Sequence, residues 1–402
     1  MVKKAIMAAA AILSAAFFIL SASAAARADV DTLDEIEKVF KPAEACSKCH
    51  SDVYQQWKKS VHGESVLHSL EGIYQYVAEG ILKEPDRQKR SVKAEAMKCF
   101  VCHAPMLDMA SEKLMGEVLD SVKQSYKHGL PDAKKKSARE TLARLNVSCF
   151  VCHNAKAVHP PGKPDQNTMY GVKAAGSSPF HSVKKTAFLD NAIFCMQCHG
   201  VYTAPDREQI ICSTISQSYR DQYVAAGGQE TCQDCHMRKK NRGHAFPGAY
   251  VLDTLKDSVT MLVNVRTVKD LPIDSTKWFP AAAVTIDLTN NAGHRLPDGC
   301  LWTARIVMDI TAKDERGQTV WSRTEEFFQP GLDIEGNRTY NAWQIKDMLD
   351  FTLPPRKTTT EKYFAVFPEG AGKINLEVRL RYIHKKGVEF IMQNEKRTLR
   401  YE

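Results

Sequence analysis

Five copies of the motif Cys-x-x-Cys-His constrain what this chain can fold into more than any other feature. They are Cys46–His50, Cys99–His103, Cys149–His153, Cys195–His199 and Cys232–His236, called motifs 1 to 5. Two thiols one helical turn apart reach the two vinyl groups of a haem and form thioethers, and the His that follows binds the iron as its proximal ligand. A single copy is also compatible with a zinc or redox site, but five copies use ten of the twelve cysteines. The repeat therefore predicts five covalently attached haem c groups.

The motifs assign a role to fifteen residues. The predicted thioether cysteines are Cys46, Cys49, Cys99, Cys102, Cys149, Cys152, Cys195, Cys198, Cys232 and Cys235. The predicted proximal iron ligands are His50, His103, His153, His199 and His236. Cys212 and Cys300 are left over, and two buried thiols or a disulfide between them are favoured over a catalytic role.

The first 28 residues have the pattern of a secretory signal peptide. Lys3 and Lys4 precede an apolar run from Ala5 to Leu20, and Ala26-Arg27-Ala28 is a small-residue cleavage site. A retained membrane anchor is the alternative, but the apolar run is short for a span. No later run is long and apolar enough to cross a bilayer. We therefore expect a mature chain from Asp29 in the periplasm or at the cell surface.

The charge of the chain says little about its partners. The net charge is +8, and loss of Lys3, Lys4 and Arg27 with the signal peptide lowers it to +5. Ten haem propionates would bring the loaded protein close to neutral or acidic, so the basic composition is weak support for an anionic partner. Nothing in the sequence resembles a nucleic-acid-binding motif, and none is expected in an exported protein.

The composition changes near residue 250, which predicts two domains after the signal peptide of residues 1–28. Residues 29–250 hold all five motifs, whose first cysteines are 53, 50, 46 and 37 residues apart. That spacing leaves too little protein for a conventional core, so we expect a helical, loop-rich pentahaem domain in which porphyrins fill much of the interior. Residues 251–402 lack the motif and are rich in strand patterns.

Local patterns place the expected elements. Apolar spacing and turn signals predict helices over 31–40, 52–60, 65–77, 107–126 and 213–226, a capping box at 137–140 that starts a helix to 145, and a surface loop over 160–179. Alternating and β-branched runs predict strands over 259–265, 282–288, 305–312, 318–323, 363–367, 374–383 and 387–392. Seven short strands in about 150 residues predict an all-β immunoglobulin-like sandwich.

The sixth coordination position of each iron decides between electron transfer and catalysis. A second His closes a haem for electron transfer, whereas an open position admits a small molecule. Thirteen histidines less five proximal ones leave eight: His62, His68, His128, His159, His181, His244, His294 and His384. Five closed haems need five distal histidines, so there are enough histidines for every iron to have two imidazole ligands.

Several segments together resemble the multihaem cytochrome c family that includes the tetrahaem electron acceptor of hydroxylamine oxidoreductase. The similar segments are 45–50 with Tyr54, Trp57, Ser60 and His62; 147–153 with His159; 170–171 and 178–181 before motif 4; 232–237 with 243–248; and 291–299, similar to the start of the β-domain of many bacterial members. Residues 154–156 read Asn-Ala-Lys where Gly-Pro-Gly is usual in the family.

The resemblance implies distal ligands for the irons. It points to His62, His159, His181 and His244, and His294 is the expected fifth, although a structural role in its Gly-His-x-x-Pro turn stays equally open. His128 is a reserve ligand. His68 is expected to pack on an amphipathic helix, and His384, beside Lys385 and Lys386, is expected to be solvated.

We expect an electron-transfer cytochrome rather than a catalyst, acting in bacterial anaerobic respiration. Its expected partners are redox proteins, either other cytochromes or a quinol-linked membrane complex. A reductase of a nitrogen or sulfur compound with one open haem is the first alternative; related pentahaem nitrite reductases use Cys-x-x-Cys-Lys at the catalytic haem, and all five motifs here end in His. A subunit of a polymeric cytochrome filament is the second alternative, so an oligomer stays open.

Overall fold

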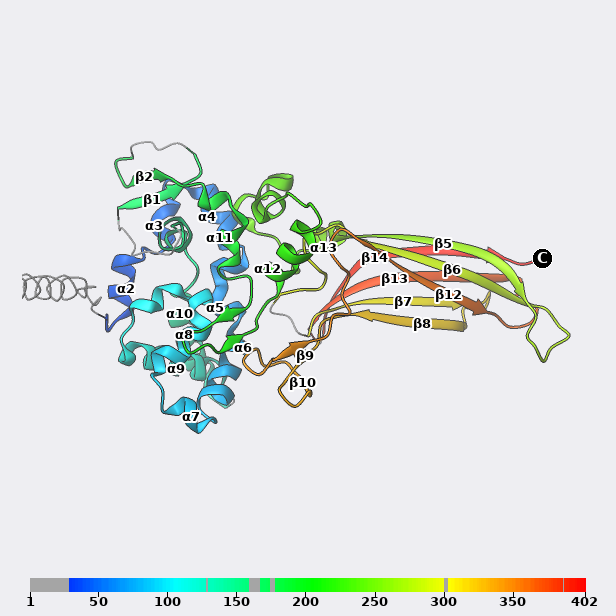
Figure 1. Ribbon diagram of the computed structural model, residues 1–402, viewed down its shortest axis with the longest axis horizontal. Helices are drawn as coiled ribbons and strands as arrows, with labels where there is room; N and C mark the ends of the chain where they lie inside the picture. The colour runs from blue at the N-terminus through cyan, green and yellow to red at the C-terminus, as the bar shows by residue number, and fades with distance from the viewer. Residues whose placement is uncertain (1–28, 128, 159–166, 174–177, 300–302, 386) are drawn as a thin grey trace, which may run out of the picture.

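The computed structural model describes residues 29–402 except 128, 159–166, 174–177, 300–302 and 386. Figure 1 shows an elongated molecule with the helices gathered at one end and long strands extending from them to the C-terminus. The signal-like residues 1–28, His128, His159 and Cys300 lie outside the described residues. Within the part of the chain that is described, no helix is long and apolar enough to cross a membrane.

The helical end consists of short helices, and among the residues described none is longer than the 15 residues of α9. The α-helices are α2 (Leu33–Val39), α3 (Glu44–Ser47), α4 (Ser51–Lys58), α5 (Ser65–His68), α6 (Leu70–Gln75), α7 (Pro85–Gln88), α8 (Val92–His103), α9 (Glu112–Tyr126), α10 (Asp132–Ala143), α11 (Ala192–Met196), α12 (Ile215–Ser218) and α13 (Leu252–Ser258). Single 3-10 or π turns are η1 (Val61–Glu64), η2 (Tyr76–Ile81), η3 (Pro105–Met109), η4 (Val151–Ala155), η5 (Phe188–Asp190), η6 (Tyr219–Val224), η7 (Asp234–Arg238), η8 (Lys239–Asn241) and η9 (Gly243–Ala245).

Most of the predicted helices are confirmed, but the predicted start of one is wrong. Helix α10 begins at Asp132, and Ser137 lies in its middle, where its carbonyl accepts a hydrogen bond from Thr141 Oγ1 at 3.1 Å. Pro131 occupies the N-cap, six residues before the N-cap that the Ser-x-x-Glu pattern suggested. A capping box is present instead at the start of α2, formed by Thr32 and Glu35.

The segment predicted as a loop over 160–179 contains a strand. Strand β1 (Thr168–Gly171) pairs in parallel with β2 (Ser182–Lys185), with Thr168 opposite Ser182. A second small sheet is the antiparallel hairpin of β3 (Tyr202–Thr203) and β4 (Gln209–Ile210) directly after motif 4. Both pairs are too short to give a clear period-two pattern, so the sequence did not indicate them.

All seven predicted long strands are confirmed, and most extend beyond the predicted ranges. They are β5 (Val259–Asp270), β6 (Phe279–Asn290), β7 (Arg305–Lys313), β8 (Thr319–Phe327), β12 (Thr358–Val366), β13 (Lys373–Lys385) and β14 (Val388–Arg400). They form two antiparallel sheets, in the orders β12-β6-β5 and β14-β13-β7-β8. Side chains from both sheets, such as Val284, Ile310 and Val378, share one core cluster, because alternate residues of each strand point inward.

A segment between β8 and β12 returns to the helical end. It contains β9 (Gly331–Leu332), β10 (Arg338–Thr339) and β11 (Asp347–Met348), which form a small sheet at the junction of the two halves (Figure 1). Between β10 and β11, Trp343 is buried in the helical core, and its ring meets that of Tyr76 at 5.1 Å. A Cβ on Gly80 would lie 3.2 Å from Trp343 and 2.7 Å from Tyr76, so only glycine leaves room for this contact.

Candidate haem-binding sites

Each motif lies on a short helical turn that brings its two thiols and its imidazole to one side. Motif 2 ends α8, and motifs 3 and 5 lie in the turns η4 and η7. In motifs 1 and 4 the His amide donates to the carbonyl of the first cysteine, from His50 to Cys46 at 2.9 Å and from His199 to Cys195 at 3.1 Å. This i to i+4 bond places first cysteine and His on the same face, as double attachment and axial ligation of one haem require.

Thiols of different motifs meet in three places. Cys46 of motif 1 lies close to Cys149 of motif 3, Cys102 of motif 2 lies close to Cys198 of motif 4, and Cys195 of motif 4 lies close to Cys232 of motif 5, so that one thiol of each pair changes the pKa of the other. The motif cysteines form no disulfide with one another. Motif 4 therefore contacts motifs 2 and 5 through its two cysteines, and motif 1 contacts motif 3.

Three proximal histidines each face a second imidazole. The ring centroids of His153 and His244 are 6.0 Å apart, those of His62 and His199 are 6.0 Å apart, and those of His236 and His294 are 6.4 Å apart. Two imidazoles that bind one metal ion in line have centroids about 6 Å apart, because each metal–nitrogen bond is about 2 Å long and the ring radii add the rest. These pairs fit an iron with one imidazole on each face.

Backbone carbonyls orient the proximal rings. His153 Nδ1 donates to the carbonyl of Tyr170 in β1, and His236 Nδ1 donates to that of Pro247, both at 2.8 Å. His103 Nδ1 donates to Ser65 in α5 at 3.3 Å. With Nδ1 engaged, Nε2 is left for the metal, which is the arrangement by which proteins fix a ligating imidazole. The unpredicted strand β1 thus has a role in holding motif 3.

Burial keeps these imidazoles in the form that binds metal. Desolvation lowers the pKa of His62, His199, His236 and His244 to about 4, and neighbouring imidazoles add to the effect. The pKa of His103 is lowered by the same cause. The rings are therefore neutral at pH 7, and neutral imidazole is the metal ligand.

Three other predicted ligands do not face a second imidazole among the described residues. Among the described residues, His50, His103 and His181 have no ring contact with a second His; His181 is partly exposed, and its Nδ1 donates to the Ser182 carbonyl at 3.3 Å. His159 lies outside the described residues, so its role stays a prediction.

Two histidines outside the motifs, His68 and His384, each contact Tyr250, which the sequence analysis did not predict. The expectation of a solvated His384 is wrong, since it is 6% exposed and its ring packs against Tyr250 at 4.4 Å. His68 packs against the same Tyr250, with the two ring centroids 4.5 Å apart. Position 384 continues the inward-facing series of β13 after Leu380 and Tyr382, and this alternation was the available signal.

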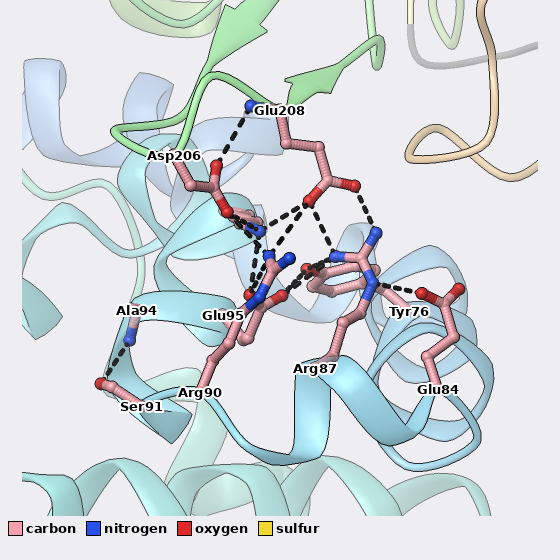
Figure 2. Close-up of polar contacts among 10 residues, drawn as sticks. Tyr76, Glu84, Arg87, Arg90, Ser91, Ala94, Glu95, Asp206 and Glu208 are labelled. Carbon is pink, nitrogen blue, oxygen red and sulfur yellow. Dashed lines mark hydrogen bonds and ion pairs between the residues drawn. The ribbon is translucent and has the colours of Figure 1, made fainter.

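A cluster of charged side chains lies beside motif 2 and was not predicted. Its members, called the ionic cluster, are Glu84, Arg87, Arg90, Glu95, Lys98, Asp206 and Glu208. Figure 2 shows Asp206 and Glu208 of the β3-β4 hairpin pointing toward Arg87 and Arg90. Lys98, directly before Cys99, donates to Glu95 at 2.9 Å and to Asp206 and Glu208 at 2.7 Å each. The cluster therefore ties motif 2 to the segment after motif 4.

Comparisons with known proteins agree with this arrangement. Residues 45–200 match the family model of cytochrome c554 and c-prime. The penta-heme cytochrome c552 from Thermochromatium tepidum has a similar fold, with a TM-score of 0.59 and 18% identity over 90% of this chain and 100% of that chain. The C-terminal domain of wzt gives only a weak match, with a TM-score of 0.22 and 8% identity over 36% of this chain and 72% of that chain. No curated protein matches the chain.

The matched residues contain four of the five motifs, and the solved cytochrome extends over almost the whole chain, including its β-rich region. Over residues 45–200 the chain resembles a family of multihaem c-type cytochromes, and its fold, with a C-terminal β region, resembles that of a solved penta-heme cytochrome. The family match supports haem c as the cofactor, electron transfer as the function and redox proteins as the partners.

Proposed function

We propose that the protein is a pentahaem c-type cytochrome that transfers electrons between redox partners in the periplasm or at the cell surface, in anaerobic respiration. The observation that carries this proposal is the spacing of His153–His244, His62–His199 and His236–His294, each fitted to one iron with two imidazole ligands. A haem closed in this way stores and releases one electron without binding substrate.

The functional residues have three roles: some attach the haems, some bind the irons, and some orient the rings that bind the irons. We propose that the ten motif cysteines attach five haems, that His50, His103, His153, His199 and His236 are proximal ligands, and that His244, His62 and His294 are distal ligands at motifs 3, 4 and 5. His159 and His181 remain the proposed distal ligands for the other two. Backbone carbonyls of Ser65, Tyr170 and Pro247 orient three of the proximal rings.

The thiol contacts support an order for electron movement. Motif 1 adjoins motif 3, while motif 4 adjoins motifs 2 and 5. Cys152 of motif 3 also lies close enough to Cys198 of motif 4 for Cys198 to raise the pKa of the Cys152 thiol. Motif 4 is then the junction, with a branch to motif 2 and a path to motif 5.

We further propose the organisation that the sequence predicts: a signal peptide at 1–28, a pentahaem domain at 29–250 and an immunoglobulin-like sandwich at 251–402. His294 reaches motif 5 from the turn after β6, so the β region supplies a ligand as well as a scaffold. N-terminal sequencing of the exported protein, with Asp29 as the expected first residue, tests the first of these boundaries.

One set of measurements on the purified protein tests the function. Intact mass and the pyridine haemochrome spectrum are expected to give five haems per chain, and electron paramagnetic resonance is expected to give low-spin signals alone. A high-spin fraction that binds cyanide or nitrite would favour a reductase instead. A mass equal to that of the bare mature chain would overturn the proposal.

A further inference from the structure

The ionic cluster is unusual because its central members are almost fully buried. The exposed fractions of the side chains are 1% for Glu95, 3% for Lys98 and 8% for Arg87, and 16% for Glu208. Burying charges is costly unless each is paired and hydrogen-bonded. Here every buried member has at least two partners: Glu95 accepts from Tyr76 at 2.8 Å, from Arg90 and Arg87 at 3.0 Å each and from Lys98.

We propose that the ionic cluster sets the reduction potential of the haem at motif 2 by placing fixed charges directly beside Cys99. The inference rests on the proposed function, because it requires a haem at that motif. It assigns Lys98 and Glu208 as positioning residues that act through their charges on a group that they do not ligate.

The charges of the cluster are held in place by the contacts themselves. Burial opposes ionisation of Glu95, but hydrogen bonds from Lys98, Tyr76 and Arg87 outweigh it, so the pKa of Glu95 lies below its usual value. Burial likewise opposes the charge of Lys98, and its bonds to Asp206, Glu208 and Glu95 raise its pKa. Both groups are therefore charged across the physiological pH range.

The sign of each charge gives the sign of its effect. Reduction adds one electron to the ferric haem and breaks no bond, so the oxidised state carries one more positive charge. A nearby carboxylate favours the oxidised state and lowers the potential, whereas an ammonium group does the opposite. Three cations face four carboxylates in the cluster, and the low exposure of Glu95, Lys98 and Arg87 keeps solvent and salt from screening these three charges.

Neutralising the two central charges separately tests this account. Lys98→Met removes a positive charge and is expected to lower the potential of one haem, while Glu208→Gln removes a negative charge and is expected to raise the potential of the same haem. The double variant is expected to return close to the wild-type potential. Spectroelectrochemical titration of the haem-loaded protein follows each step.

A purely structural role predicts a different pattern. Loosening the cluster would admit water to motif 2 in every variant and shift the potential in the same direction each time. Asp86 on α7 and Lys89 at its C-cap form an exposed pair, 3.1 Å apart and 89% and 75% exposed, that supplies matched controls. Lys89→Met and Asp86→Asn change the charge by the same amount in solvent, and are expected to leave all potentials unchanged.

Shifts of the same sign in Lys98→Met and Glu208→Gln, or no shift in either, would overturn the inference. If Glu208→Gln loses haem, Asp206→Asn replaces it, since this carboxylate binds Lys98 at the 37%-exposed edge of the cluster and its loss is expected to raise the potential. If Lys98→Met loses haem, Arg90→Gln replaces it, since this 45%-exposed cation binds Glu95 and Asp206 and its loss is expected to lower the potential. The haem count and the spin state of the wild-type protein test the proposed function separately, so failure of one does not imply failure of the other.

Discussion

The imidazole rings of His236 and His294 lie almost parallel, at an angle of 13°, with their centroids 6.4 Å apart. His236 belongs to motif 5, whereas His294 lies in the turn after β6. A single iron between them would be bound by the helical half and by the β half of the molecule, so haem attachment at motif 5 would also join the two halves.

Replacing His294 should therefore open one haem. His294→Ala is expected to convert one low-spin haem into a high-spin haem that binds cyanide, and to lower the unfolding temperature, because the iron loses its ligand from the β region. Electron paramagnetic resonance and cyanide titration measure the first effect. Asn291→Ala, which removes a 3.1 Å bond from the same turn to the Asp257 carbonyl, is the control and should remain low-spin. Unchanged spectra in His294→Ala would contradict the assignment.

Gly243 holds His244 in position, and alanine should not be accepted there. Gly243 has a φ of +56°, and a Cβ would lie 2.2 Å from Gln56 Oε1, the atom that accepts the His244 amide at 2.9 Å. Gly243→Ala is expected to cost about 1–3 kcal/mol in the free energy of unfolding and to weaken low-spin ligation at motif 3. Denaturant unfolding and the optical spectrum report these effects. Gly248→Ala, with no atom within 4 Å of the added Cβ, should behave as wild type; equal losses in both variants would refute this explanation.

Trp343 fastens the segment between β8 and β12 to the helical core. Trp343→Ala removes its contact with Tyr76, and a buried Trp of this size contributes about 3–5 kcal/mol to the free energy of unfolding. We expect a loss of that order, measured by urea unfolding of the haem-loaded protein. Trp278→Ala removes a Trp that is 58% exposed and should cost little. A stable Trp343→Ala protein would mean that the junction is held by other contacts.

Acid should weaken the ionic cluster, because it protonates Glu95. The pKa of Glu95 is lower in the folded chain than its reference value of 4.5, so its contribution to stability is complete above that value and disappears as the pH falls through the lower folded pKa. Urea midpoints measured from pH 7 to pH 3 should fall in the wild type. Glu95→Gln should be less stable at pH 7, because Lys98 and Arg87 lose a buried partner, and should show a smaller further loss in acid.

An exposed carboxylate provides the comparison for this experiment. Glu117 is 59% exposed and pairs with Lys113 at 3.9 Å, so Glu117→Gln should keep both the stability at pH 7 and the acid response of the wild type. If Glu95→Gln retained the full acid response, the cluster would not be its source.

The sequence predicted the elements whose signals are local. Cys-x-x-Cys-His is complete within five residues, and the long strands alternate over enough residues to be recognised. The pairing of His236 with His294 could not be predicted from a local pattern, because His294 lies in a turn 58 residues further along the chain. The resemblance to a known family placed His294 in the candidate set, and only the fold shows which imidazole it faces.

The ionic cluster was missed for a different reason. Lys98 and Glu95 are charged residues on a short helix, and such residues usually face solvent. Their partners Asp206 and Glu208 lie more than a hundred residues away, on a hairpin too short to be predicted. Burial of these charges is a property of the tertiary contact, which no local pattern contains.

The close approach of Cys46 to Cys149 and of Cys195 to Cys232 has a consequence for biogenesis. If the chain is exported to an oxidising compartment, as we propose, such neighbouring thiols can form disulfides, and a cysteine so consumed is lost to thioether formation. A chain that folded before it received its haems would then be a dead-end product. We therefore expect maturation in the opposite order, with the thiols kept reduced until each haem is attached and with folding completed last.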